Sequence, residues 1–301
     1  MYQPRKTSRS EFVPIRTLRY HVRVWGEPSA DKVPLLLVHG WMDVAASWQF
    51  VVDAFSRDRY VIAPDWRGYG LTQSPAVDNY WFPDYLADLD HLLDHYGGGK
   101  PVDLVGHSMG GNVAMLYTGA RPERIRRLVN LEGFGMPATR ASQAPGRYAK
   151  WMDEIKAFGR GEMELKSYDS VDGVARRLMK TNRRLSQDKA DWLARHWARP
   201  DDDGQWRILG DAAHKITNAQ LFRVDEVLEL YRRITCPVLM VEASDDSLGQ
   251  WWQGRFTLAE FHERLQAVPH LQTARVEDAG HMLHHDQPHE LAALIEEFID
   301  R

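Results

Sequence analysis

The sequence predicts a doubly wound α/β protein, in which helices cover both faces of a mostly parallel sheet. Short, nearly continuous apolar runs recur along the chain and are followed by turn signals, which is typical of strands buried on both faces. Stretches with helical spacing of apolar residues lie between them, for example from Tyr85 to Leu93. This alternation is the pattern of parallel strands joined by crossover helices. The expected strands are Leu35 to His39, Tyr60 to Ala63, Val102 to Val105, Leu128 to Leu131 and Val238 to Val241.

Length, composition and charge limit the class of protein. The chain has 301 residues, 44% hydrophobic and 27% charged, which is the range of ordinary globular proteins. Its 38 basic and 42 acidic residues give a formal net charge of -4, which offers no overall attraction for nucleic acid or an anionic membrane. Cys236 is the only cysteine, so no disulfide forms within the chain. Because no secretory signal or membrane-spanning run is present, we expect a cytoplasmic protein without nucleic-acid or membrane partners.

The alternation of strands and helices breaks between Gly133 and Glu226, where the sequence becomes helical, charged and rich in aromatic residues. We interpret this segment as a helical cap inserted into the α/β core. The expected division is residues 1–134 for the first part of the core, 135–226 for the cap and 227–301 for the second part of the core.

Aromatic and basic residues distinguish the expected cap. Aromatic side chains at helical spacing are expected mainly to form the core of the cap and to close an apolar pocket beneath it. The basic stretch from Arg176 to Arg184 is expected to be a solvated helix face. The aromatic residues are Trp151, Phe158, Trp192, Trp197 and Trp206.

A candidate nucleophile lies between an expected strand and an expected helix. Gly106-His107-Ser108-Met109-Gly110 directly follows the strand that ends at Val105. A glycine on each side of such a turn lets the backbone bend sharply enough to lift the serine hydroxyl above the sheet. The positive end of the following helix then lies beside the hydroxyl. We therefore expect Ser108 to be a catalytic nucleophile.

A serine hydroxyl needs a histidine to accept its proton and a carboxylate to orient that histidine. His281 is the expected base, because it follows the strand-like run Leu271 to Val276 and lies in a loop before the last helix. The neighbouring His284, His285 and His289 raise the question of a metal site. No acidic or cysteine partner pattern accompanies them, so no metal is expected.

Three acidic residues are candidates for the orienting carboxylate. The strand that ends at Val241 leads into a polar loop containing Asp245 and Asp246. We select Asp246, while Asp245 stays possible because loop geometry cannot be assigned to a single residue from sequence. Glu132, which follows the strand ending at Leu131, is a separate alternative.

The oxyanion hole and the substrate pocket are expected beside Ser108. The backbone N–H groups of Trp41 and Met109 are placed to stabilise a developing negative charge. The indole of Trp41 would then line the acyl site, and Trp251 and Trp252 would add further walls. His39 is expected to anchor its loop and not to act as a second base.

Together these motifs resemble those of the α/β-hydrolase superfamily across nearly the whole chain outside the cap. The resemblance implies an eight-stranded, mostly parallel sheet flanked by helices, with the cap inserted after the sixth strand. The motifs are His39-Gly40-Trp41, Asp65-Trp66-Arg67-Gly68-Tyr69-Gly70, Gly106-His107-Ser108-Met109-Gly110-Gly111, Cys236-Pro237-Val238-Leu239 and Gly280-His281-Met282-Leu283.

Two segments, His39 to Asp43 and Asn130 to Gly135, are most similar to the branch of serine hydrolase-like proteins. The family's acid position maps onto Asp246, although glycine is common in the family where Ala243 stands. Haloalkane dehalogenases, which are among the relatives, take their acid from the position that matches Glu132. Those enzymes and the epoxide hydrolases use an aspartate nucleophile, and Ser108 replaces it here.

The sequence therefore predicts a serine hydrolase, of carboxylesterase type, that cleaves a carboxylic ester of a small to medium apolar substrate without a metal or organic cofactor. The expected partner is the small-molecule ester alone. Alternatives with the same catalytic residues are a cofactor-free perhydrolase and a lactone or carbon–carbon hydrolase. A non-catalytic ligand-binding protein of the same fold is the alternative from another class. The sequence does not define the oligomeric state.

Overall fold

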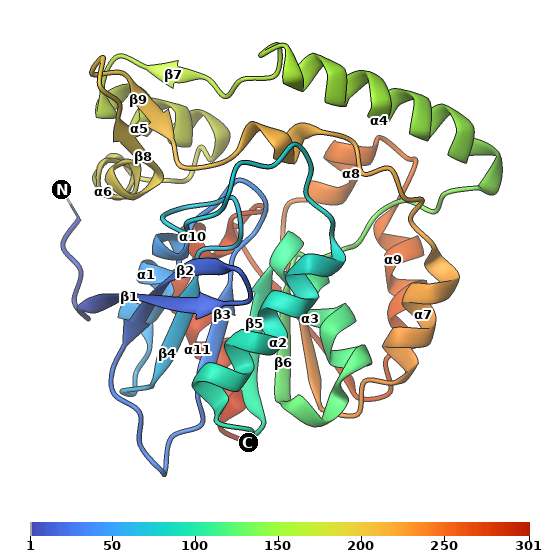
Figure 1. The fold of residues 1–301 in the computed structure, drawn as a ribbon. Coiled ribbons are helices and arrows are strands. Elements are labelled where there is room, and N and C mark those ends of the chain that lie inside the picture. Colours follow the sequence, from blue (N-terminus) through green and yellow to red (C-terminus); the bar gives the residue numbers. More distant parts are fainter. Residues whose placement is uncertain (1) are drawn as a thin grey trace.

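The computed structural model describes residues 2–301, and its centre is a twisted eight-stranded sheet (Figure 1). The strand order is β1-β2-β4-β3-β5-β6-β10-β11. The first two strands form a hairpin that joins the sheet antiparallel, and all other neighbouring strands are parallel. The expected fold class is therefore confirmed. The strands are β1 (Ser8–Ile15), β2 (Leu18–Trp25), β3 (Leu35–Val38), β4 (Val61–Pro64), β5 (Val102–His107), β6 (Ile125–Leu131), β10 (Val238–Ala243) and β11 (Leu271–Val276).

Helices cover both faces of the sheet, which explains why the central strands β3, β4 and β5 are buried at every residue. Successive residues of a strand point to opposite faces: Leu36 and Leu104 lie in one core, whereas Leu37 and Val105 lie in the other. On the first face α2 and α7 pack against α3, and on the second α1 packs against α11. The helices are α1 (Gln49–Ala54), α2 (Pro83–Gly97), α3 (Met109–Ala120), α7 (Val224–Arg232), α8 (Ser247–Trp252), α9 (Leu258–Leu265), α10 (Leu283–Asp286) and α11 (Pro288–Ile299).

The segment between β6 and α7 forms a cap beside the carboxyl ends of the parallel strands (Figure 1). Its core comes from α5 and α6, where Val174, Leu178 and Leu193 pack with Phe50 of the α/β core. Trp192 is buried in the same cluster. The elements of the cap are α4 (Ala144–Gly159), β7 (Ser167–Tyr168), α5 (Val171–Thr181), α6 (Gln187–Trp197), β8 (Ala198–Pro200) and β9 (Trp206–Ile208).

Three features of the fold differ from the pattern expected from sequence. The cap contains a small antiparallel sheet, β7-β9-β8, whose strands are too short to produce an apolar run. The hairpin β1–β2 was also not expected, because β1 is mostly exposed or half-buried and lacks the continuous apolar run of the other strands. Helix α7 begins at Val224 and packs on α3, so the expected boundary at residue 226 falls inside a helix of the core.

Within residues 2–301, no helix combines the length and the apolar character that crossing a bilayer requires.

Candidate active site

Ser108 occupies a sharp turn between β5 and α3. Its backbone angles, φ 53° and ψ −116°, are a strained combination for a residue with a side chain, and such strain costs about 1–3 kcal/mol. The flanking glycines make the turn possible. A Cβ on Gly106 would lie 2.4 Å from the carbonyl oxygen of Gly110, and a Cβ on Gly110 would lie 2.4 Å from that of Val38. The amide of Ser108 donates to the carbonyl of Leu131 at 2.8 Å, which fixes the turn against β6.

The imidazole of His281 lies within hydrogen-bond distance of the Ser108 hydroxyl. The two atoms, Nε2 of His281 and Oγ of Ser108, are 2.9 Å apart although 173 residues separate them in sequence. His107 Nε2 donates to the carbonyl of His281 at 2.7 Å and so holds the backbone of this loop. The indole of Trp251 lies edge-on to the His281 ring, with ring centroids 4.2 Å apart. The structure thus brings together the expected nucleophile and the expected base.

Glu132, at the carboxyl end of β6, is the acidic residue that faces His281. Its Oε2 lies 3.3 Å from Nδ1 of His281. Its Oε1 accepts the backbone N–H of Ala243 at 2.7 Å, and the side chain is almost fully buried. A carboxylate only accepts hydrogen bonds, so the proton of a neutral His281 lies on Nδ1 and the lone pair of Nε2 faces Ser108. This is the tautomer that a general base requires.

The selection of Asp246 as this acid was wrong. Asp246 is exposed and caps α8, where its Oδ1 accepts the N–H of Gly249 at 2.7 Å. After β10, the amides of Ser244 and Asp245 bond to carbonyls of Val276 and Ala279, so the loop runs alongside the segment that leads to His281, while the Asp246 side chain is exposed.

The alternative Asp245 is also directed elsewhere, because it pairs with Arg184 of the cap at 2.7 Å. Arg184 reaches Asp278 as well, at 3.1 Å, so this residue of the expected solvated face links the cap to the core.

The sequence also contains a signal for Glu132, which we ranked below that for Asp246. A carboxylate directly follows a buried apolar strand and precedes Gly133, and the chain turns there with a φ of 55° at Glu132. Asn130 stabilises the turn, because its side chain bonds to both the N–H and the carbonyl of Gly133 at 3.0 Å.

Burial sets the protonation state of His281. Burial lowers the pKa of His281 below its ordinary value, and the neighbouring Glu132 opposes this shift without cancelling it. The imidazole is therefore neutral at neutral pH, and its Nε2 is free to accept a proton.

Two backbone amides beside Ser108 are suited to hold an oxyanion. A Cβ on Gly40 would lie 3.1 Å from the Cβ of Ser108, so the loop that contains Trp41 passes directly beside the nucleophile. Met109 is the first residue of α3. Among residues 2–301, neither the N–H of Trp41 nor that of Met109 has a hydrogen-bond partner. Unpaired amides at a helix start and an adjacent loop are typical of an oxyanion hole.

His39 anchors the oxyanion loop, as expected. Its Nδ1 donates to the carbonyl of Gly40 at 2.8 Å, and its Nε2 accepts the amide of Trp66 at 2.9 Å. Burial lowers the pKa of His39, so it stays neutral, and neither ring nitrogen is free for a proton transfer.

A cavity of about 320 Å³ between the core and the cap reaches Ser108 and His281. Trp41 lies in its wall. The expected walls Trp251 and Trp252 do not lie there. Trp251 is half-exposed beside His281, and Trp252 packs against the core and under the guanidinium of Arg255. Exposed cationic side chains of Lys166, Arg177 and Lys215 also border the cavity. Its apolar lining residues are Trp41, Met42, Leu165, Leu178, Leu185, Trp197, Ile208 and Met282.

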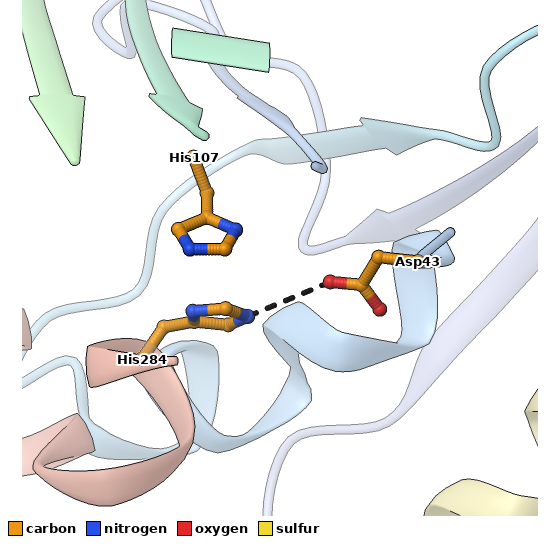
Figure 2. Close-up of side chains that lie close together, drawn as sticks. All are labelled: Asp43, His107 and His284. Atoms are coloured by element: carbon orange, nitrogen blue, oxygen red, sulfur yellow. Dashed lines mark ion pairs between the residues drawn. The ribbon is translucent and has the colours of Figure 1, made fainter. Parts of the chain in front are cut away.

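Asp43, His107 and His284 form a second cluster of polar side chains next to this cavity (Figure 2). All three are buried, and one nitrogen or oxygen atom of each lies within 4.8 Å of the others. His289, which the sequence placed near this group, is exposed on α11. The acidic residue of this cluster, Asp43, precedes His284 by more than two hundred residues, so no local pattern in the sequence links the two.

Comparison with known proteins assigns the chain to a family. Residues 33–288 match the α/β-hydrolase fold family, so the chain belongs to that family of hydrolases. It is 28% identical over 239 residues to a serine hydrolase-like protein of Danio rerio, covering 78% of this chain and 72% of that protein. A 2-hydroxy-6-oxo-2,4-heptadienoate hydrolase of Pseudomonas putida is 39% identical over 106 residues, which cover 34% of this chain and 38% of that enzyme.

A solved structure shows the same fold over nearly the whole chain. The thioesterase domain from the curacin biosynthetic pathway superposes with a TM-score of 0.81 at 22% identity, covering 96% of this chain and 99% of that domain.

A pair of isosteric variants distinguishes the roles of Glu132 and Asp246. Glu132→Gln should lower turnover of p-nitrophenyl acetate by roughly a factor of 10³–10⁴, since loss of the orienting carboxylate leaves the wrong tautomer of His281. Asp246→Asn should retain most activity, because its carboxylate only caps an exposed helix end. Equal impairment of the two variants, or a larger loss in Asp246→Asn, would contradict the assignment.

The pH dependence of kcat/KM reports the pKa of His281. Because burial lowers this pKa, the neutral base persists at lower pH, and the acid limb should have its midpoint below the ordinary histidine value of about 6.5. In Glu132→Gln the residual activity should show a limb at still lower pH, because Glu132 raises the pKa of His281. An acid limb that moves to higher pH in this variant would refute the contact between Glu132 and His281.

Proposed function

We propose that the protein is a serine hydrolase that cleaves carboxylic esters of small to medium apolar acids through an acyl-enzyme on Ser108. The observation that carries this proposal is the contact between the Ser108 hydroxyl and the neutral imidazole of His281, at 2.9 Å, with Glu132 behind the ring. Nucleophile, base and orienting acid in this order are the requirements of serine catalysis.

In the first half of the reaction, Oγ of Ser108 attacks the acyl carbonyl while Nε2 of His281 takes the hydroxyl proton. The carbonyl oxygen becomes an oxyanion, which the amides of Trp41 and Met109 stabilise. Glu132 stabilises the imidazolium that forms. The tetrahedral intermediate then collapses, the bond to the alcohol oxygen breaks, and His281 gives its proton to that oxygen.

In the second half, water replaces the alcohol. His281 takes a proton from this water, whose oxygen attacks the acyl-enzyme and forms a second oxyanion in the same hole. Collapse of this intermediate breaks the bond to Ser108 Oγ, which recovers its proton from His281, and the carboxylic acid leaves. No other proton carrier is needed, because Nε2 of His281 serves both halves.

The nucleophile distinguishes ester hydrolysis from the epoxide hydrolysis and dehalogenation that other proteins of this fold carry out. Epoxide hydrolases and haloalkane dehalogenases use an aspartate where Ser108 stands, and the ester that forms on their aspartate is hydrolysed at the carboxyl carbon. A serine ether formed by attack on an epoxide or a haloalkane would have no such route to release. Ser108 therefore favours acyl transfer.

The cavity supports the proposed size of the acyl group. Its volume of about 320 Å³ is at the small end of the range for ligand pockets, and most of its lining surface is apolar although half of its lining residues are polar or charged. Each buried methylene adds up to about 0.8 kcal/mol of binding until the wall is reached.

A second candidate is a carbon–carbon bond hydrolase that acts on a substrate with a carboxylate. The exposed cations Lys166, Arg177 and Lys215 at the cavity favour an anionic group, and the Pseudomonas putida relative is named for a dienoate substrate. The same serine and histidine would act on the carbonyl carbon. Faster cleavage of an anionic substrate, with loss of this preference in Lys166→Ala and Arg177→Ala, would favour this candidate over the neutral ester.

The nucleophile assignment predicts the behaviour of Ser108→Ala. This variant should lose ester turnover by a factor of roughly 10³ or more while its thermal unfolding stays close to that of the wild type. A fluorophosphonate should label the wild type once, and peptide mass spectrometry should locate the adduct on Ser108. Undiminished activity in the variant, or labelling at another residue, would exclude the proposed mechanism.

The cavity predicts an optimum of acyl chain length. In a series of p-nitrophenyl esters, kcat/KM should rise for short chains and fall once the chain exceeds the cavity, because overpacking outweighs further burial. Leu165→Ala should shift the optimum to longer chains, since Leu165 lines the cavity. Met152→Ala is the matched control, because Met152 is exposed on α4 and does not line it. Efficiency that rises through the longest chains would indicate a lipase instead.

A further inference from the structure

Asp43, His107 and His284 converge from three separate parts of the core (Figure 2). Asp43 lies in the loop after β3, His107 ends β5, and His284 belongs to α10. Their exposed fractions are 3%, 2% and 0%. None of these side chains has a part in the proposed steps of hydrolysis, so their burial together needs a separate explanation.

Two buried acceptor atoms of the cluster, Nδ1 of His107 and Oδ2 of Asp43, receive no hydrogen bond. His107 Nε2 donates to the carbonyl of His281, so in the neutral ring the lone pair is on Nδ1, which has no partner. Burial lowers the pKa of His107 well below its ordinary value, so the ring is neutral. Asp43 Oδ1 accepts the amide of Val44 and the indole N–H of Trp197, at 2.8 and 3.2 Å, whereas Oδ2 has no partner.

His284 lies close to both acceptor atoms but donates a hydrogen bond to neither of them. Its Nε2 is 3.7 Å from Oδ2 of Asp43, which is too long for a hydrogen bond, and both of its ring nitrogens lack a partner. A neutral imidazole has one N–H and cannot donate to both neighbours. Buried polar atoms without partners cost about 1–3 kcal/mol each, so a group that satisfies several of them at once would be strongly favoured.

We propose that Asp43, His107 and His284 form a binding site for a divalent transition-metal ion such as Zn²⁺ or Co²⁺. Two imidazole nitrogens and one carboxylate oxygen are ligands that these ions prefer. Ligand atoms around a tetrahedral Zn²⁺ lie about 3.3 Å apart for bonds of about 2.0–2.1 Å. The three atoms lie within 4.8 Å of one another, so the widest pair must contract by about 1.5 Å at most. Asp43 and His107 border the substrate cavity, which provides a path of entry.

The proposed metal site lies next to the catalytic residues. His107 directly precedes Ser108, and its Nε2 holds the carbonyl of His281 at 2.7 Å. A cation on Nδ1 leaves this hydrogen bond in place, because a metal-bound imidazole ordinarily donates its other N–H to a carbonyl or carboxylate.

The test is a titration of chelator-treated protein with Co²⁺, followed by visible absorption, and with Zn²⁺, followed by calorimetry. Wild-type protein should bind one equivalent of either ion and should show the strong visible band of four-coordinate Co²⁺. Protein whose Ser108 has been blocked with a fluorophosphonate should bind the same amount, which separates this site from metal binding at Ser108 and His281. X-ray absorption of the zinc-loaded protein should show two imidazole ligands.

Variants locate the ion. Asp43→Asn and His284→Gln should each lower the affinity at least about tenfold and abolish the visible band. His262→Ala is the control for adventitious binding, because His262 is exposed and pairs with Glu242 at 2.7 Å on the surface. Far-UV circular dichroism of each variant checks the fold.

Three results would overturn the proposal: no binding to the wild type, a band that persists in both cluster variants, or a band lost in His262→Ala. If neither cluster variant folds, X-ray absorption of the zinc-loaded wild type tests the site. A spectrum that lacks two imidazole ligands would reject it.

Discussion

The Glu132 carboxylate is the interaction on which the geometry of the site depends. One oxygen accepts the amide of Ala243 and the other faces Nδ1 of His281, so a single buried side chain joins β6, β10 and the loop after β11. The parallel sheet makes this possible, because neighbouring strands end at the same edge. Without the carboxylate, His281 would lose the partner that selects its tautomer, and Ser108 would face a ring nitrogen of undefined protonation.

Burial and hydrogen-bond partners give the histidines of this region different tasks. Burial lowers the pKa of His39, His107 and His281, so all three rings are neutral. His39 uses both nitrogens to anchor the oxyanion loop, and His107 uses Nε2 to hold the His281 loop. His281 alone places an unprotonated nitrogen next to Ser108. The chemistry of each ring therefore follows from what its other nitrogen contacts.

The sequence predicted the parts of the site that depend on local pattern. Glycines on both sides of Ser108, directly after an apolar strand, define the turn that the structure shows, and the loop after Leu271 to Val276 placed His281 at the same sheet edge. The acid depends on loop paths that sequence does not encode locally. Both Glu132 and Asp246 follow strands at the correct edge. In the folded chain Glu132 accepts the amide of Ala243 in the interior, whereas Asp246 caps α8 at the surface, and no local pattern separates the two.

Long-range pairings were the other part that the sequence could not provide. The adjacent histidines His284 and His285 would suggest a metal site only with an acidic partner, and Asp43 is brought near His284 by folding alone. The cap sheet gave no signal because β7 has only two residues and β8 only three.

The most direct test of the central claim, that Glu132 orients His281, is the proton spectrum of the free protein. The Nδ1 proton of His281, hydrogen-bonded to a buried carboxylate, should resonate far downfield of the amide protons and show coupling to nitrogen in ¹⁵N-labelled protein. The resonance should be present in the wild type and in Asp246→Asn and absent from Glu132→Gln. A resonance that survives in Glu132→Gln and disappears in Asp246→Asn would contradict the account.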